Sequence, residues 1–150
     1  IIVKSLMLKK NYFWYYYLMK KEFKHEIKVY YEDTDAGGVV YYANYLKFLE
    51  RARTEAINSI GFSNKKLIEE YGIFIIVKSC KINFVKPARL EDKLIIYSKI
   101  SSIKKVSFVI NQIIRLKKQI LVEAEILLAS INKNGKPTKI PEVFAKKLIK

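Results

Sequence analysis

The chain has 150 residues, of which 51% are hydrophobic and 29% are charged, so its composition fits one folded domain and excludes global disorder. Its formal net charge of +15 favours attraction to an anionic partner. The lysines are scattered along the chain, however, and this distribution favours a solvated basic surface over a dedicated nucleic-acid-binding face.

The first 18 residues differ in composition from the rest of the chain. They contain a dense aromatic run, and the uncharged stretch from Asn11 to Met19 is shorter than the roughly 20 apolar residues that span a bilayer. No small-residue cleavage site of a signal peptide follows it, so no transmembrane or secretory segment is predicted. Met19 begins a sequence typical of a small cytoplasmic enzyme. We therefore expect residues 1–18 to be a dispensable or disordered N-terminal extension and residues 19–150 to form the domain.

The next part of the chain predicts a strand, a turn and a long helix. Residues 25–31 alternate in a β-rich pattern, and the polar segment 32–38 contains two glycines. Apolar residues spaced three or four apart then predict a helix over residues 45–60. Asn44 is the expected N-cap, and Gly61 is expected to follow the last turn.

After this helix the periodicity changes from helical to strand-like. A second, short helix is expected from Ser63 to about Gly72. Four runs rich in Ile, Val, Tyr and Phe predict strands over residues 73–85, 93–103, 106–116 and 120–132. Their short connections predict a meander, and a short helix is expected over residues 142–150. Cys80, the only cysteine, excludes an internal disulfide bond, fits a reducing compartment and is expected to be a small packed side chain.

This element order predicts an α+β fold. Only one long helix is available to cover a face of the antiparallel sheet, so the simplest compact arrangement is a curled sheet wrapped around that helix. Sheet edges left unpaired would favour association with a second subunit.

Several kinds of chemistry are excluded by the residues that the chain lacks. With one histidine and no G-x-S-x-G motif, a Ser-His-Asp hydrolase is excluded, and one cysteine with one histidine cannot form a structural zinc site. What remains is carboxylate chemistry at Asp33 and Asp35, just before a helix start whose free N–H groups can stabilise an oxyanion. Gly37 and Gly38 would let the backbone approach a substrate closely. An acidic turn with capping aspartates explains the same pattern, and spacing alone favours that structural interpretation.

The segment Val29–Tyr45, VYYEDTDAGGVVYYANY, resembles the signature of the hotdog acyl-CoA thioesterases. The resemblance is closest to the YbgC-type branch linked to the Tol–Pal cell-envelope system, which is related to 4-hydroxybenzoyl-CoA thioesterase. Residues 46–54 (LKFLERART), 83–90 (NFVKPARL) and 135–137 (GKP) extend it, so that it covers roughly residues 20–147. It implies the hotdog fold and the hydrolysis of short-chain or aryl acyl-CoA thioesters to the free acid and coenzyme A.

The same resemblance implies roles for individual residues. Asp35 would be the essential carboxylate, acting as nucleophile or as general base for water, while Asp33 would shape the turn. The backbone N–H of Tyr42 would polarise the thioester oxygen. YbgC-type proteins commonly carry histidine at this position, so a backbone role is kept here and a histidine side-chain role is lost.

The resemblance also implies which residues bind the substrate, which oligomer the chain forms and which partners it has. The expected substrate-binding residues are Gly37, Gly38, Val39, Lys86 and Arg89. For Lys86 and Arg89, contact with coenzyme A phosphates and a purely structural role remain equally open. No metal is expected, and no cofactor apart from the coenzyme A of the substrate. A cytoplasmic homodimer or homotetramer with active sites at the subunit boundary is expected, and an acyl carrier protein is a further candidate partner.

Three other functions remain to be distinguished. A non-catalytic scaffold that binds acyl carrier protein or acyl groups at the cell envelope would suit the positive charge. A hotdog hydratase would need a histidine with a carboxylate, and His25 lies outside any such motif. Nucleic-acid binding has only the basic surface in its favour, so no nucleic-acid partner is expected.

Overall fold

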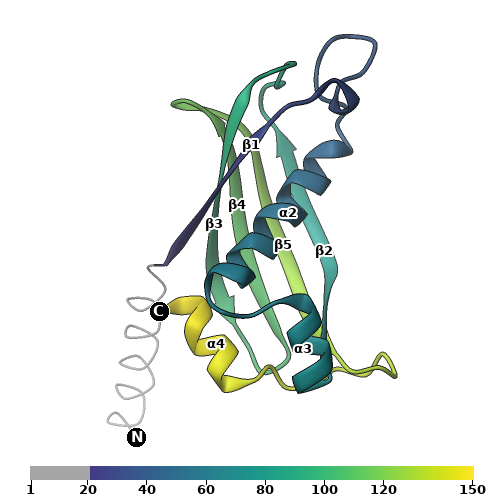
Figure 1. The fold of residues 1–150 in the computed structure, drawn as a ribbon, viewed down its shortest axis with the longest axis vertical. Helices are drawn as coiled ribbons and strands as arrows, with labels where there is room; N and C mark the ends of the chain where they lie inside the picture. The colour runs from purple at the N-terminus through teal and green to yellow at the C-terminus, as the bar shows by residue number, and fades with distance from the viewer. Residues whose placement is uncertain (1–20) are drawn as a thin grey trace, which may run out of the picture.

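The structure, a computed structural model, describes residues 21–150, and the expected extension of residues 1–18 lies outside the described residues. Its elements in chain order are β1 (Glu22–Lys28), η1 (Tyr31–Asp33), α2 (Asn44–Ser59), α3 (Asn64–Tyr71), β2 (Phe74–Phe84), β3 (Lys93–Ile103), β4 (Ser107–Leu116), β5 (Gln119–Ile131) and α4 (Glu142–Ile149). The strands form one antiparallel sheet that curls around α2 (Figure 1), so the expected α+β architecture is confirmed. None of the described helices is long and apolar enough to cross a membrane.

The core lies between α2 and the inner face of the sheet. Buried and more exposed residues alternate along β3, β4 and β5, as expected for strands with one face on a core. Ile96, Ile110 and Ile126 are buried on that inner face, and Phe48 and Leu49 are buried on the facing side of α2. Each fully buried side chain of this kind contributes roughly 1.5–3 kcal/mol, so the helix is fixed to the sheet by its apolar stripe.

A buried polar side chain adds a directional anchor between the helix and the sheet. Gln112 of β4 is fully buried, and its Nε2 donates to the Leu49 carbonyl of α2 at 3.1 Å and to Ser98 Oγ of β3 at 2.8 Å. Its Oε1 accepts from Arg53 Nη1 at 3.0 Å. Burial lowers the pKa of the Arg53 guanidinium, although not enough for it to lose its charge. The bonds of Gln112 allow little sliding of α2, and the position of the helix N-terminus is fixed as a result.

The helix α2 begins differently from the prediction. Ala43 rather than Asn44 is the N-cap residue, and it makes no side-chain cap. The prediction was wrong because the side chain of Asn44 makes a different hydrogen bond: its Nδ2 donates to the Asp33 carbonyl at 3.1 Å. The other end agrees with the prediction, because Gly61 follows the last turn with a φ of +81°.

The later elements agree closely with the sequence. The helix α3 begins after Ser63, whose Oγ accepts from the Lys66 amide at 3.0 Å, and ends at Gly72 in the left-handed conformation. Strands β2 to β5 begin and end within one residue of the predicted bounds. The first strand ends earlier than predicted, at Lys28, because the chain turns into η1 at Tyr31.

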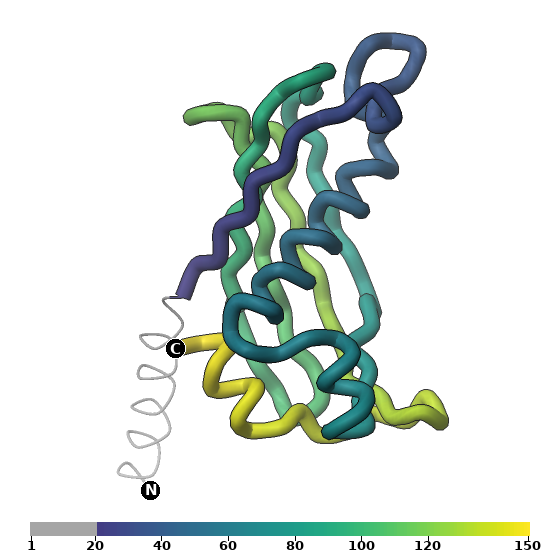
Figure 2. Tube along the Cα trace, viewed as in Figure 1, coloured from purple at the N-terminus to yellow at the C-terminus, as the bar shows by residue number. Residues whose placement is uncertain are grey.

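The order of the strands corrects the predicted meander. The sheet order is β1-β3-β4-β5-β2, so only β3, β4 and β5 form a meander, and β2 pairs with β5 at the far edge. The connection from β2 to β3 crosses the end of the sheet instead of forming a hairpin. It bonds to the segment after β1: the Val29 amide donates to Asp92 O at 2.9 Å and the Val40 amide to Ala88 O at 2.9 Å. Residues 29–40 and 85–92 therefore lie together at one end of the molecule (Figure 2).

The edge position of β2 also corrects the expectation for Cys80. The thiol is free and the residue is exposed rather than packed. Most residues of β2 are exposed because the strand has a neighbour on only one side.

Candidate active site

Asp33 organises the segment that precedes α2. It is 6% exposed, and its Oδ2 accepts from the Tyr30 amide at 2.9 Å. Its carbonyl oxygen accepts from the Tyr41 amide at 2.9 Å and from Asn44 Nδ2 at 3.1 Å. Both the carboxylate and the carbonyl are thus used to join η1 to the start of the helix. The expectation that Asp33 shapes the turn agrees with these contacts.

Asp35 lies in a small hairpin formed by residues 34–40. Thr34 pairs with Val40, the Asp35 amide donates to Val39 O at 2.9 Å, and the Gly38 amide donates to Asp35 O at 3.0 Å. The side chain of Asp35 is exposed, and its Oδ1 accepts from the Gly37 amide at 2.8 Å. Within the described residues Oδ2 has no hydrogen-bond partner, so one carboxylate oxygen is held while the other is available.

The two glycines of this hairpin meet different requirements. Gly38 has a φ of +73°, a backbone conformation that side chains other than glycine rarely adopt. A Cβ on Gly37 would lie 3.1 Å from Asp35 Oδ1, which is closer than most contacts of this kind. Gly38 therefore permits the turn, and Gly37 leaves room for the Asp35 carboxylate.

Tyr42 stands where the chain enters α2. The amides of its neighbours have acceptors, since Tyr41 N–H donates to Asp33 O and Asn44 N–H donates to Tyr41 O, both at 2.9 Å. Among residues 21–150, the Tyr42 N–H makes no hydrogen bond. It is one of the unpaired donors at a helix N-terminus, where the helix dipole also favours negative charge.

The connection from β2 to β3 supplies the other wall of this region. Arg89 pairs with Val39 through the backbone, and its amide donates to Asp92 Oδ2 at 2.8 Å. The structure therefore brings Arg89 beside the hairpin of Asp35. Lys86 is exposed on the same connection, but its amide donates to Leu121 O of β5 at 3.1 Å rather than to the hairpin.

An aromatic cluster between α2 and β2 was not predicted from the sequence. The ring of Phe84, at the end of β2, lies 6.2 Å from the ring of Tyr42 and 5.7 Å from that of Tyr45. The Tyr41 and Tyr42 ring centroids are 4.9 Å apart, and hydrogen bonding to the Tyr42 hydroxyl raises the pKa of the Tyr41 phenol. Phe84 lies within the segment 83–90 that resembles the family, but the pairing of β2 at the far edge of the sheet is what brings its ring to Tyr42.

Tyr45 links this cluster to the core. It is buried, and its phenol oxygen accepts from the Ala88 amide at 2.8 Å. Burial is the main cause that raises the pKa of the Tyr45 phenol. The hydroxyl therefore remains neutral and holds the β2–β3 connection against the first turn of α2.

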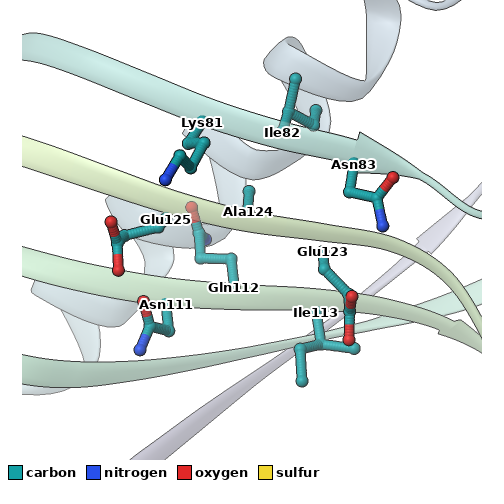
Figure 3. A pocket seen from close by; sticks show the side chains of 9 residues that line it. All are labelled: Lys81, Ile82, Asn83, Asn111, Gln112, Ile113, Glu123, Ala124 and Glu125. Carbon is teal, nitrogen blue, oxygen red and sulfur yellow. The ribbon is translucent and has the colours of Figure 1, made fainter.

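A cavity of about 380 Å³ on the outer face of the sheet contains none of the predicted site residues. It lies over β2, β5 and β4, and its polar side chains include Lys81, Asn111 and Glu125, which are neighbours across the strands (Figure 3). Charges of opposite sign on adjacent strands suit a solvated sheet face. The chemistry predicted from the sequence lies instead at the end of the sheet where α2 begins.

Comparison with protein families and curated sequences gives a consistent result. The model of the family described as the thioesterase-like superfamily matches residues 29–148. The acyl-CoA thioesterase YbgC of Haemophilus influenzae is 35% identical over 126 residues, which cover 83% of this chain and 93% of that protein. The acyl-CoA thioester hydrolase YbgC of Escherichia coli O6:H1 is 41% identical over 122 residues, which cover 80% of this chain and 90% of that protein.

Solved structures agree with the sequence relatives. A probable thioesterase from Bartonella henselae has a TM-score of 0.77 and 36% sequence identity, with 81% of this chain and all of that chain covered. The 4-hydroxybenzoyl-CoA thioesterase of a Pseudomonas strain shares the fold with a TM-score of 0.79 at 21% identity. The match covers the candidate site as well as the fold, because residues 29–148 include both the hairpin and the start of α2.

Proposed function

The chain belongs to the thioesterase-like superfamily, and from this membership we propose that it hydrolyses acyl-CoA thioesters to the free acid and coenzyme A, with Asp35 as the essential carboxylate. Its similarity to proteins named acyl-CoA thioesterase supports the reaction. The preferred acyl groups are proposed to be short-chain or aryl. Gly37, Gly38 and Val39 would form the backbone around the reacting group.

One observation carries the assignment of the site. Asp35 has one oxygen fixed by the Gly37 amide and the other unpartnered within the described residues, and the segment that holds it leads directly to the unpaired Tyr42 N–H. Thioester hydrolysis needs a base or nucleophile together with a donor for the developing oxyanion. Asp33 does not meet this requirement because it is buried and its Oδ2 is bonded to Tyr30.

The proposed reaction begins when the thioester carbonyl oxygen accepts a hydrogen bond from the Tyr42 N–H. If Asp35 is a general base, it takes a proton from water, and the resulting hydroxide attacks the carbonyl carbon. The carbon–sulfur bond then breaks, and the proton held by Asp35 passes to the leaving thiolate. If Asp35 is a nucleophile, its oxygen forms an acyl anhydride as the thiolate leaves, and water then hydrolyses the anhydride. Both routes give the acid and coenzyme A.

The phosphates of coenzyme A are proposed to lie near Lys86 and Arg89. Arg89 stands beside the hairpin through its pairing with Val39, and Lys86 is exposed on the same connection. An arginine can contact a phosphate through two parallel hydrogen bonds. The net charge of +15 would further attract an anionic substrate or an acidic acyl carrier protein, which is a further candidate partner.

A second copy of the chain is proposed to pair along β2, which would give a homodimer or, by further association, a homotetramer. The two sheet edges differ: Glu22, Lys24, Glu26 and Lys28 alternate along β1, whereas Ile76 and Val77 are exposed on β2. Alternating charges protect an edge strand from association, and exposed apolar residues favour it. The free, exposed thiol of Cys80 suits a reducing compartment, which supports the proposed cytoplasmic location.

The proposal is tested by measuring free-thiol release from purified full-length chain with a panel of short-chain, long-chain and aryl acyl-CoA thioesters. We expect release well above the rate without enzyme for at least one member of the panel. Equilibrium binding of the same thioesters is measured in parallel. If the chain binds these thioesters but hydrolyses none of them, the proposed reaction is wrong and the non-catalytic acyl-binding scaffold is favoured.

A further inference from the structure

Three exposed aromatic residues form a continuous surface beside the unpaired amide of α2. Tyr41, Tyr42 and Phe84, which we call the aromatic surface, have exposed fractions of 47%, 62% and 45%. Their rings lie side by side: the ring centroids of Tyr41 and Tyr42 are 4.9 Å apart, and those of Tyr42 and Phe84 are 6.2 Å apart. Neighbouring exposed rings on a small domain mark a surface that binds something apolar.

The position of this surface relative to the reacting group follows from the bound carbonyl. A carbonyl oxygen about 2.9 Å from the Tyr42 nitrogen places its carbon roughly 4 Å from that nitrogen. The ring of Tyr42 belongs to the same residue, and Phe84 contacts that ring at the end of β2. The aromatic surface therefore includes the side chain of the residue whose N–H would hold the carbonyl, and it is exposed beside the position of the acyl group.

We propose that the aromatic surface binds the acyl group and selects planar aryl thioesters, with Phe84 as the specificity-determining side chain. This inference rests on the proposed thioesterase activity and assigns its substrate class. The Tyr42 and Phe84 rings meet at an interplanar angle of 86°, so they offer an incoming ring one face and one edge. Both are favourable arrangements for a third aromatic ring.

A flexible alkyl chain of similar size gains less from the same surface. It has no ring quadrupole to match the exposed face and edge, and it loses rotational freedom when it becomes ordered. A benzoyl group is rigid apart from one bond and loses less. One aromatic pair is worth about a two- to tenfold preference beyond the area that it buries.

The anchoring of the neighbouring residues keeps this surface in place. Tyr45 contacts Phe84 at 5.7 Å and is itself fixed by the Ala88 amide. Phe84 pairs with Val122 of β5 in the sheet, so its backbone is held on one side. A pre-organised surface of this kind binds without an ordering cost of its own.

The test compares kcat/KM for benzoyl-CoA and hexanoyl-CoA in the wild-type chain and in Phe84→Leu, with free-thiol release as the readout. We expect the wild type to prefer benzoyl-CoA by about tenfold or more, and Phe84→Leu to reduce this preference by about two- to tenfold with hexanoyl-CoA almost unaffected. Phe84→Tyr should keep the preference because the ring remains. Tyr97→Leu is the matched control, because Tyr97 lies on β3 and packs with Lys24 and Arg115 instead of the site.

Each alternative outcome contradicts a different claim. A wild type that hydrolyses hexanoyl-CoA at least as well as benzoyl-CoA overturns the aryl preference and leaves the thioesterase intact. An equal loss with both substrates in Phe84→Leu would mean that the ring has only a structural role. A lower molecular mass of this variant by light scattering would assign the surface to a second copy. Hydrolysis of no thioester at all would remove the proposed function and this inference with it.

Discussion

The segment before α2 has two halves, η1 and the hairpin of residues 34–40, and each contains one aspartate. The two aspartates differ in burial and in the hydrogen bonds that they accept. In the η1 half, Asp33 is 6% exposed and bonds the Tyr30, Tyr41 and Asn44 groups around it. In the hairpin half, Asp35 is exposed and its side chain accepts only from Gly37 within the described residues. Burial and the use of their acceptors thus distinguish two residues of the same type, two positions apart, as a structural carboxylate and the carboxylate that we propose to be reactive.

The largest expected effect comes from Asp35→Asn. The amide can still accept from the Gly37 N–H, so the hairpin should keep its shape, but it can neither take a proton from water nor form an anhydride. We expect kcat/KM for acyl-CoA hydrolysis to fall at least about a hundredfold. The free energy of unfolding should change by less than about 0.5 kcal/mol.

Thiol-release kinetics and urea denaturation monitored by circular dichroism measure the two quantities on the same preparation. Retention of wild-type kcat/KM by a folded Asp35→Asn variant would remove Asp35 from the proposed mechanism. Such a result would also mean that burial and hydrogen bonding do not assign different roles to Asp33 and Asp35.

Asp33→Ala is expected to have the opposite profile. Removal of the carboxylate takes the charged acceptor from the Tyr30 amide in a part-buried hydrogen bond, which should lower the free energy of unfolding by about 1–3 kcal/mol. Asp33→Asn is the matched control, because its amide oxygen can still accept from Tyr30 and its loss should be smaller. If Asp33→Ala unfolds at the same urea concentration as the wild type, the structural role of Asp33 is wrong.

The sequence predicts the elements well because their signals are local. The helix end at Gly61 and the Ser63 cap depend on neighbouring residues, and both agree with the structure. The strand order could not be predicted, because the pairing of β2 with β5 is decided by contacts between distant segments. The exposure of Cys80 was missed for the same reason.

The candidate site was only partly accessible from the sequence. Spacing alone could not tell Asp33 from Asp35, and the family resemblance supplied that distinction. The contact of Phe84 with Tyr42, on which its proposed role rests, required the structure, because the two residues are distant in the sequence and meet only through the sheet. The N-cap prediction failed because a tertiary contact, from Asn44 to Asp33, competed with the local cap.

The smallest expected effects separate shape from chemistry within the hairpin itself. Gly38→Ala places a Cβ at a φ of +73° in open space, so strain should lower the free energy of unfolding by about 1–2 kcal/mol. Gly37→Ala brings no such strain, but its Cβ would lie 3.1 Å from Asp35 Oδ1 and must move the carboxylate by a few tenths of an ångström. Since a shift of about 1 Å can cost a hundredfold in rate, we expect Gly37→Ala to lower kcat/KM by roughly tenfold at nearly unchanged stability. Wild-type kinetics in Gly37→Ala would mean that the position of the Asp35 carboxylate in the hairpin is not the one used in the reaction.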